Sequence, residues 1–404
     1  MKTVLFVGAG RHQRRAIAQA HERGLRVVAV DRNPEAVGFQ VADIKEPVDF
    51  TDVDAVTEVA RRHDVDGVLT VSADRAVPVV AAVTERLGLP SISTEVAHRV
   101  THKIAMRRCL AEAGVPQPRF AAVRKHAEAR GAIRSVGLPA VLKPADSGGQ
   151  RGVFRLEHAD DLDAHLHVAL HESATGEAIV EAFTEGIEMN GIVIVRDGEP
   201  HVVTLSDRLR PPGIGFGVGW IHVYPASIFG DQLELAEEVA VHSVRALGLR
   251  DAIAFPQLIA GENGSVQVVE VAARIPGGQM ADLVRHAVGI DLVEVALRQA
   301  LGEDVPDEIA LPRFQQPLAI RFLTAEPGPL RAGKVTRVGN LEPVLAAEGV
   351  VQADVYLQVG ETIRPVRLDG DRRGYVIATA ETSVVALARA EAAARLLEVE
   401  VDGR

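Results

Sequence analysis

The residues best suited to chemistry begin with a lysine that precedes a run of glycines. In the stretch VLKPADSGGQRGV, Lys143 ends an apolar segment and is followed by Ser147, Gly148, Gly149 and Gly152. Glycines let backbone N–H groups approach phosphate oxygens, and a lysine ammonium beside them adds positive charge. The pattern predicts a phosphate-binding loop, and a flexible hairpin loop with a surface lysine is the alternative. No GK[ST] follows, so the loop is not of the Walker A type.

Two glutamates lie further along the chain, at and beyond the end of another apolar segment. Glu181 and Phe183 close the segment AIVEAF, and Glu188 follows. A carboxylate at a strand end can accept a hydrogen bond from the amino group of adenine, and a second can accept both ribose hydroxyls. Taken singly, each glutamate is better explained as a solvated charge. Their interpretation therefore depends on the neighbouring motifs.

A third group of polar residues lies in AFPQLIAGENGSVQVVEVAARIPGG. If the chain turns at Asn263-Gly264, then Gln257 and Glu270 lie opposite each other on antiparallel strands and point to one face. Their oxygens suit Mg²⁺, which takes one or two carboxylates together with phosphate oxygens. Arg274 follows the second strand and is placed to bind a carboxylate or a transferring phosphoryl group. An ordinary hairpin with an exposed arginine is the alternative.

The elements that position these residues fall into three parts. Residues 1–100 alternate short β-branched strands (TVLFVG, LRVVAVD, GVLTV) with helices expected around 16–20, 53–62 and 76–87. This alternation predicts a Rossmann-like parallel sheet with crossover helices. The loop GAGRHQ resembles a dinucleotide fingerprint, but Gln13 replaces its third glycine, so NAD binding is a minor alternative.

After Pro90 the pattern changes to strands and helices of mixed order. Helices are expected around 101–112, 159–172, 231–247, 279–288, 291–301 and 383–397, with hairpin turns at Asp197-Gly198 and Asn263-Gly264. The segment RPPGIGFGVGW at 210–220 is expected to be a mobile loop over a site. We expect domains at 1–100, 101–312 and 313–404, with a subdomain at about 115–182 that carries the glycine-rich loop and a small C-terminal α+β lid.

Composition excludes several classes of protein. The chain has 404 residues and a formal net charge of −11, which argues against a nucleic-acid partner. Cys109 is the only cysteine, so neither an internal disulfide nor a cysteine-based zinc site is expected, and a reducing compartment follows. The apolar start of the chain is too short for a signal peptide or a membrane span. A cytoplasmic enzyme without a membrane partner is expected.

In this order, the motifs resemble the ATP-grasp superfamily, specifically its carboxylate-amine ligase branch. That branch includes the L-amino acid ligases, carboxyaminoimidazole ribonucleotide synthase, biotin carboxylase and the carbamoyl-phosphate synthetase large chain. The similarity covers essentially the whole chain, including SADRAVPVVAAVTERLGLP and DRRGYVIATAETSVVALARA. Two positions depart from the usual pattern. Gln257 stands where most members have a glutamate, and Ala272 stands where many have a metal-binding asparagine, as in the EVAAR form of the L-amino acid ligases. These departures leave open whether one or two metal ions bind.

The resemblance implies roles for the individual residues. Lys103 and Lys143 would contact the phosphates of ATP under a closing loop at 146–152, Glu181 and the Phe183 backbone would hold adenine, and Glu188 would hold the ribose. Gln257 and Glu270 would bind Mg²⁺, with Mn²⁺ as a possible substitute, and Arg274 and Lys143 would be catalytic.

The resemblance also implies an overall reaction, in which an ADP-forming ligase activates a small carboxylate, an amino acid, as an acyl phosphate for transfer to an amine. A bicarbonate-using carboxylase of the purine or biotin type, an NAD-dependent dehydrogenase and a non-catalytic nucleotide-binding protein are the alternatives. A homodimer is the default expectation for such an enzyme.

Overall fold

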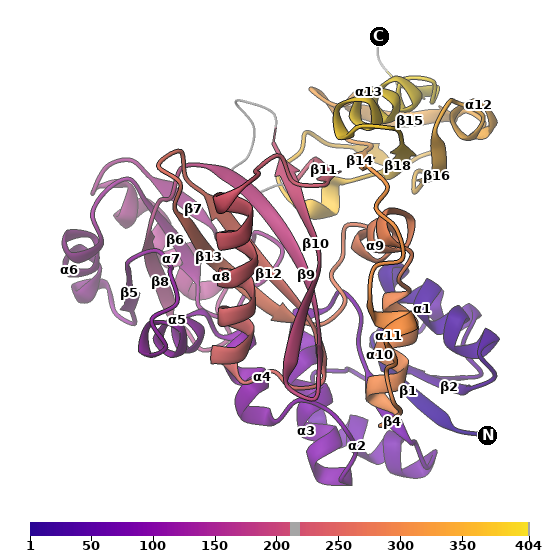
Figure 1. The fold of residues 1–404 in the computed structure, drawn as a ribbon, viewed down its shortest axis with the longest axis horizontal. Coiled ribbons are helices and arrows are strands. Elements are labelled where there is room, and N and C mark those ends of the chain that lie inside the picture. Colours follow the sequence, from indigo (N-terminus) through magenta and orange to yellow (C-terminus); the bar gives the residue numbers. More distant parts are fainter. Residues whose placement is uncertain (211–218, 403–404) are drawn as a thin grey trace.

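The structure is a computed structural model that describes residues 1–210 and 219–402. Figure 1 shows the N-terminal part beneath a large central sheet, with the C-terminal part at the opposite end. No helix in the described residues is both long enough and apolar enough to cross a bilayer. Residues 211–218, where a mobile loop was expected, lie outside the described residues.

The N-terminal part is the predicted parallel sheet with crossover helices. Its strands lie in the order β3-β2-β1-β4 and pair in parallel. Every residue of the central strand β1 is buried, because helices cover both faces, and this explains the near-continuous apolar runs in the sequence. The elements are β1 (Thr3–Val7), α1 (Arg11–Glu22), β2 (Arg26–Val30), η1 (Val37–Gln40), β3 (Ile44–Glu46), α2 (Val53–Arg62), β4 (Gly67–Leu69), η2 (Asp74–Ala76) and α3 (Val77–Leu87).

Two helices lead from this sheet into the next part, where the sequence predicted one helix over 101–112. They are α4 (Thr94–Thr101), which was not predicted, and α5 (Lys103–Glu112), which agrees with the helix predicted around 101–112. His102 is extended between them, and its Nδ1 accepts a hydrogen bond from the N–H of Ala105. The N–H of Lys103 donates to the carbonyl of Ala145 at 2.7 Å. This tertiary hydrogen bond ties the start of α5 to the segment that follows β6.

A four-stranded antiparallel sheet in the order β5-β8-β6-β7 carries the glycine-rich loop. The loop joins β6 to β7, as the sequence predicted. Leu142, Leu162 and Leu166 are fully buried where α6 and α7 pack against the sheet. The elements are β5 (Phe120–Val123), α6 (His126–Val136), β6 (Ala140–Pro144), β7 (Phe154–Leu156), α7 (Asp161–His171) and β8 (Ala178–Ala182).

The central sheet has eight antiparallel strands in the order β13-β12-β9-β10-β11-β14-β18-β16. Its last three strands come from the C-terminal part, so one sheet continues across the predicted boundary at residue 313, and the domain boundaries remain a prediction. The strands are β9 (Ile187–Arg196), β10 (Glu199–Leu209), β11 (Ile221–Tyr224), β12 (Ala252–Ala260), β13 (Val266–Ala273), β14 (Leu318–Phe322), β16 (Val350–Val355) and β18 (Gly374–Thr379).

Helices cover both faces of this sheet. Helix α8 (Asp231–Leu247) packs on one face, whereas α9 (Met280–Val288) and α10 (Leu292–Ala300) pack between the other face and the N-terminal part. The remaining elements are α11 (Asp307–Ala310), β15 (Gly333–Val338), α12 (Glu342–Leu345), β17 (Thr362–Ile363), η3 (Asp369–Asp371), α13 (Ser383–Ala394) and β19 (Val399–Val401).

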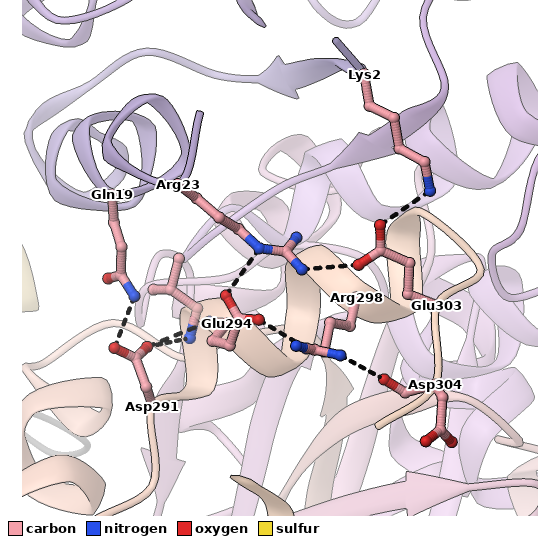
Figure 2. Close-up of polar contacts among 9 residues, drawn as sticks. Lys2, Gln19, Arg23, Asp291, Glu294, Arg298, Glu303 and Asp304 are labelled. Atoms are coloured by element: carbon pink, nitrogen blue, oxygen red, sulfur yellow. Dashed lines mark hydrogen bonds and ion pairs between the residues drawn. The ribbon is translucent and has the colours of Figure 1, made fainter. Parts of the chain in front are cut away.

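Polar contacts fasten helix α10 and the residues after it to the N-terminal sheet. Figure 2 shows Arg23, directly after α1, between Glu294 and Glu303; the ion pairs measure 3.1 and 2.7 Å. Lys2 also reaches Glu303, at 2.9 Å, and Gln19 donates to Asp291 at 2.6 Å. These ion pairs are partly exposed, so each contributes little alone, but the network fixes orientation. The N-terminal sheet is thereby held against the segment that follows β13.

A close approach between β4 and the end of α10 provides a test of the packing. A Cβ placed on Gly67 in β4 would lie 2.6 Å from the carbonyl oxygen of Ala300 at the end of α10. We expect Gly67→Ala to lower the free energy of unfolding by about 1–3 kcal/mol, because the helix must move away from the strand. Urea denaturation followed by circular dichroism measures the change.

Gly131→Ala is the matched control. Gly131 lies inside α6, and the only atom within 4 Å of a Cβ placed there is the end of the Arg134 side chain, at 3.8 Å. Alanine is expected to stabilise this helix by about 0.5–1 kcal/mol. Equal effects of the two substitutions would contradict the packing of α10 on β4.

Candidate active site

The predicted site residues meet in a cavity of about 420 Å³. The N-terminal sheet, the glycine-rich loop, the central sheet and the C-terminal part all contribute to its walls. Of the twelve residues predicted from the sequence, eleven line this cavity and Gly152 does not. The lining residues among them are Lys103, Lys143, Ser147, Gly148, Gly149, Glu181, Phe183, Glu188, Gln257, Glu270 and Arg274.

A buried ion network lies beneath the cavity. Glu181, only 2% exposed, pairs through one oxygen with Arg107 Nε at 2.8 Å and through the other with Lys143 Nζ at 2.7 Å. Burial alone would raise the pKa of Glu181, but the charges of Arg107 and Lys143 outweigh it and lower the pKa to about 2. The carboxylate is therefore ionised at neutral pH. It holds the Lys143 ammonium at the cavity wall.

Arg107 was not predicted from the sequence, although it organises this network. It is 1% exposed and also donates to the backbone carbonyls of Val268 at 3.0 Å and Val269 at 2.5 Å. Those carbonyls precede Glu270 in β13. One guanidinium thus fixes Glu181 and the strand that carries Glu270. Glu181 therefore balances the charges of Arg107 and Lys143. Its predicted contact with adenine stays a prediction.

Lys103 joins the glycine-rich loop to the predicted metal site. Its ammonium donates to the Ser147 carbonyl at 2.7 Å and lies 3.5 Å from Glu270 Oε1. Burial raises the pKa of Glu270, but Lys103 and Lys143 outweigh it and the pKa falls below its usual value. Gln257 pairs with Glu270 across β12 and β13, so the predicted cross-strand arrangement is confirmed.

The oxygens of Gln257 and Glu270 fit a Mg²⁺ ion that arrives with phosphate. In the described parts of the chain, no group of three or more His, Cys, Asp or Glu side chains is arranged to hold a metal ion alone. Mg²⁺ keeps several waters and commonly takes one or two protein oxygens beside substrate phosphates. One carboxylate and one amide oxygen on the cavity wall suit such an ion, which would neutralise phosphate charge.

The glycine-rich loop has features expected of a phosphate cradle. Ser147 is buried, and within the described residues its Oγ has no hydrogen-bond partner. Gly149 has φ +70°, which favours glycine. A Cβ on Gly152 would lie 2.9 Å from the Pro144 side chain and would not line the cavity, so packing explains that glycine. Its predicted phosphate contact remains a prediction.

Arg274 meets an acidic residue that the sequence analysis did not identify. The Oδ1 of Asp74, in η2 of the N-terminal part, accepts a hydrogen bond from Arg274 Nε at 2.7 Å and forms an ion pair with Nη2 at 2.5 Å. Ser72, Gln150 and Gln279 line the same cavity with φ near +60°, an unfavourable conformation for residues other than glycine. Such backbone strain concentrates at functional sites.

The end of the cavity near the C-terminal part is rich in cations. Arg11 lies over the Tyr356 ring at 4.4 Å, and Arg372 lies over the Phe322 ring at 4.0 Å. Arg208 pairs with Glu188 at 2.9 Å, and Arg372 pairs with Asp369 at 2.8 Å. An anionic group of a ligand would balance the positive charge that remains. Arg11 and Arg372 had not been predicted.

Polar residues of β10 and β11 near the cavity divide into two groups. His222 lines the cavity with Arg208, and burial together with Arg372 and Arg208 holds the pKa of His222 well below its usual value. The ring is therefore neutral at physiological pH. Asp207 accepts from the N–H of Ser227 at 3.1 Å, and neither Asp207 nor Tyr224 lines the cavity. Glu188 also pairs with Arg210, and its predicted ribose contact remains untested.

Three family descriptions match successive parts of the chain. Residues 17–91 match the ATP-grasp N-terminal domain, residues 102–308 match the ATP-binding domain of the carbamoyl-phosphate synthase L chain, and residues 321–402 match the L-amino acid ligase C-terminal domain 2. The second match alone covers about half of the chain. Together, these three matches follow one another along the chain and cover most of the sequence.

Individual relatives agree with these matches. The chain is 30% identical to "Uncharacterized protein y4rH" of Sinorhizobium fredii, over 82% of this chain and 68% of the relative. It is 27% identical to the formate-dependent phosphoribosylglycinamide formyltransferase of Ignicoccus hospitalis, over 98% and 95%. Two solved structures share its fold. One is an L-amino acid ligase from Bacillus licheniformis (19% identity, TM-score 0.85, covering 100% and 99%), and the other is an N5-carboxyaminoimidazole ribonucleotide synthetase from Thermotoga maritima (21%, 0.76, 100% of both).

The low pKa of Glu181 predicts a pH dependence of stability. Because folding lowers this pKa from 4.5 to about 2, the ionised carboxylate stabilises the folded state fully above about pH 5. As the pH falls from about 5 towards 2, a contribution on the order of 3 kcal/mol is lost. Unfolding free energies of the wild type and Glu181→Gln, measured by urea denaturation at successive pH values, should converge as the pH falls.

Glu199→Gln serves as the control for that series. Glu199 is the first residue of β10, and it forms an exposed ion pair with Arg245 of α8. This variant is expected to retain the pH dependence of the wild type. A Glu181→Gln curve parallel to that of the wild type through the acidic range would show that the buried carboxylate is not the source.

Proposed function

Because the chain belongs to the carboxylate-amine ligase branch of the ATP-grasp superfamily, we propose that it activates an amino acid and joins it to an amine. In the first step Mg·ATP would convert the carboxylate to an acyl phosphate, and in the second an amine would displace phosphate. The observation that carries this proposal is that Lys103, Lys143, the loop with Ser147, and Glu270 share one cavity.

The charges around the cavity support phosphoryl transfer to a carboxylate. Attack of a carboxylate on the γ-phosphoryl group brings two anions together, so positioning and cationic screening must supply most of the catalysis. Lys143 is held by Glu181, and Lys103 is held between Ser147 and Glu270. Fixed cations need no rearrangement when the phosphate charge develops. A Mg²⁺ ion at Gln257 and Glu270 would add further positive charge.

The walls of the cavity suit a reaction with an unstable intermediate. Acyl phosphates hydrolyse readily, so the reacting groups have to be kept from bulk water. Ser72 of the N-terminal part and Tyr356 of the C-terminal part both line the cavity. Arg274, 11% exposed in its side chain, lies at this wall and is placed to hold the acyl phosphate.

The cation-rich end supports a substrate that carries an additional anionic group. Arg11, Arg208 and Arg372 all line that end of the cavity. The α-carboxylate of an amino acid would pair with an arginine fork in two parallel hydrogen bonds. We therefore propose amino acids as the first substrates to test, and a homodimer as the assembly to expect.

A second candidate reaction is the formylation of a phosphorylated amine. It is favoured by the 27% identity, over 98% of this chain, to a formate-dependent phosphoribosylglycinamide formyltransferase. Formate would then be the activated carboxylate, and the phosphate of the amine substrate would occupy the same cation-rich end. The two candidates differ in both substrates, so one screen separates them.

A substrate screen by phosphate release tests the proposal. Purified protein with Mg·ATP is given pairs of carboxylates and amines, including amino acids, formate and phosphorylated amines. We expect phosphate release that requires both members of a pair. Lys143→Ala and Glu270→Gln are expected to lower the rate by about 10²-fold or more, because each removes a group placed at the transferring phosphate.

Lys45→Ala is the control, because Lys45 is exposed on the N-terminal edge strand β3, away from the cavity. It should retain the wild-type rate. Undiminished activity of Lys143→Ala and Glu270→Gln would refute the site, and no release with any pair would refute the proposed function.

A further inference from the structure

Asp74 presents one carboxylate oxygen to the cavity without a partner. Its Oδ1 accepts a hydrogen bond from Arg274 Nε and forms an ion pair with Arg274 Nη2. Across residues 1–210 and 219–402, no hydrogen bond to Oδ2 is found. A Cβ placed on Gly148 would lie 2.8 Å from Oδ2, so this oxygen faces the glycine-rich loop. Asp74 therefore lies between Arg274 and the loop proposed to bind phosphate.

A carboxylate in this position needs a positive charge beside it when a phosphate ligand binds. Beside a triphosphate or an acyl phosphate, an unmatched carboxylate would repel the ligand. The nearby lysines do not supply the missing charge, because Lys143 pairs with Glu181 and Lys103 contacts Ser147 and Glu270. Arg274 already occupies the opposite oxygen of Asp74. A cation at Oδ2 must therefore come with a ligand.

The amine substrate supplies a cation of the right kind. An aliphatic amine is protonated at neutral pH, and an ammonium has three N–H donors that suit a carboxylate oxygen. A Mg²⁺ ion is accounted for elsewhere, because Gln257 and Glu270 also line the cavity and offer oxygens for the metal.

Building on the proposed ligase function, we propose that Asp74 is a catalytic residue that binds the amine substrate as an ammonium and accepts a proton from it. Deprotonation frees the nitrogen lone pair, which forms the C–N bond at the carbonyl carbon of the acyl phosphate. The C–O bond to phosphate breaks and its electron pair leaves with the phosphate. The second N–H proton goes to the departing phosphate, and Asp74 later returns its proton to water.

Two acceptors that differ in protonation test this role. With ATP and an accepted carboxylate, the amide formed with the amine is measured beside the hydroxamate formed with hydroxylamine, which is largely unprotonated at neutral pH. We expect Asp74→Asn to lower amide formation by about 10²–10⁴-fold, the usual contribution of a general base. Hydroxamate formation should stay within a few-fold of the wild type, because hydroxylamine needs no proton acceptor before it attacks.

Two further measurements sharpen the comparison. The residual amide formation of Asp74→Asn should rise with pH as the fraction of free amine grows, and Asp74→Glu, which keeps a carboxylate, should recover part of the lost rate. Asp54→Asn makes the same chemical change at a side chain of α2 that is 87% exposed and pairs with Arg86. Both products should be unchanged in that variant.

Three results would overturn the inference. An equal loss of amide and hydroxamate in Asp74→Asn would show that Asp74 only positions Arg274. Recovery of the Asp74→Asn rate by a higher Mg²⁺ concentration would show that Asp74 is a metal ligand. Failure of the wild type to form either product with any carboxylate would refute the proposed function itself, and the role of Asp74 with it.

Discussion

The structure of the site depends on charge balance inside one buried cleft. Glu181 is almost inaccessible to water, and an isolated carboxylate there would be strongly destabilised. Arg107 and Lys143 neutralise it at 2.8 and 2.7 Å, and their own burial is tolerated because the carboxylate lies between them. Glu270 and Lys103 repeat this arrangement at the neighbouring wall. Lysines fixed in this way present positive charge to the cavity before any ligand arrives.

This charge balance requires distant parts of the chain to meet accurately. Arg107 lies in α5, Glu181 in β8 and Lys143 in β6, and the backbone of β13 accepts two further hydrogen bonds from Arg107. The segment after β13 then crosses to the N-terminal sheet, where α10 and its polar network are held (Figures 1 and 2). The same crossing brings Arg274 to Asp74. The fold and the site therefore share the same long-range contacts.

Local sequence patterns predicted part of the fold and part of the site. The Asn263-Gly264 turn joins β12 to β13, and a register shift between Gln257 and Leu258 then places Gln257 opposite Glu270. The glycines after Lys143 indicate a loop whatever elements surround it. Asp74 and Arg274 are 200 positions apart, so no local pattern announces their contact. Arg107 has an arginine beside it in the sequence, and only the packing of α5 decides which of the two is buried. Helix α4 was not predicted, and a tertiary hydrogen bond from Lys103 to Ala145, which no local pattern shows, fixes the start of α5.

One structure determination tests the central claim most directly. The claim is that Lys103, Lys143, the loop at 146–152 and Glu270 bind a single nucleoside triphosphate. In crystals grown with Mg²⁺ and a non-hydrolysable ATP analogue, the triphosphate should lie between the ammonium groups of Lys103 and Lys143, beneath the loop at 146–152. The metal should contact Glu270. A nucleotide bound elsewhere on the protein, with this cavity occupied only by water, would contradict the claim.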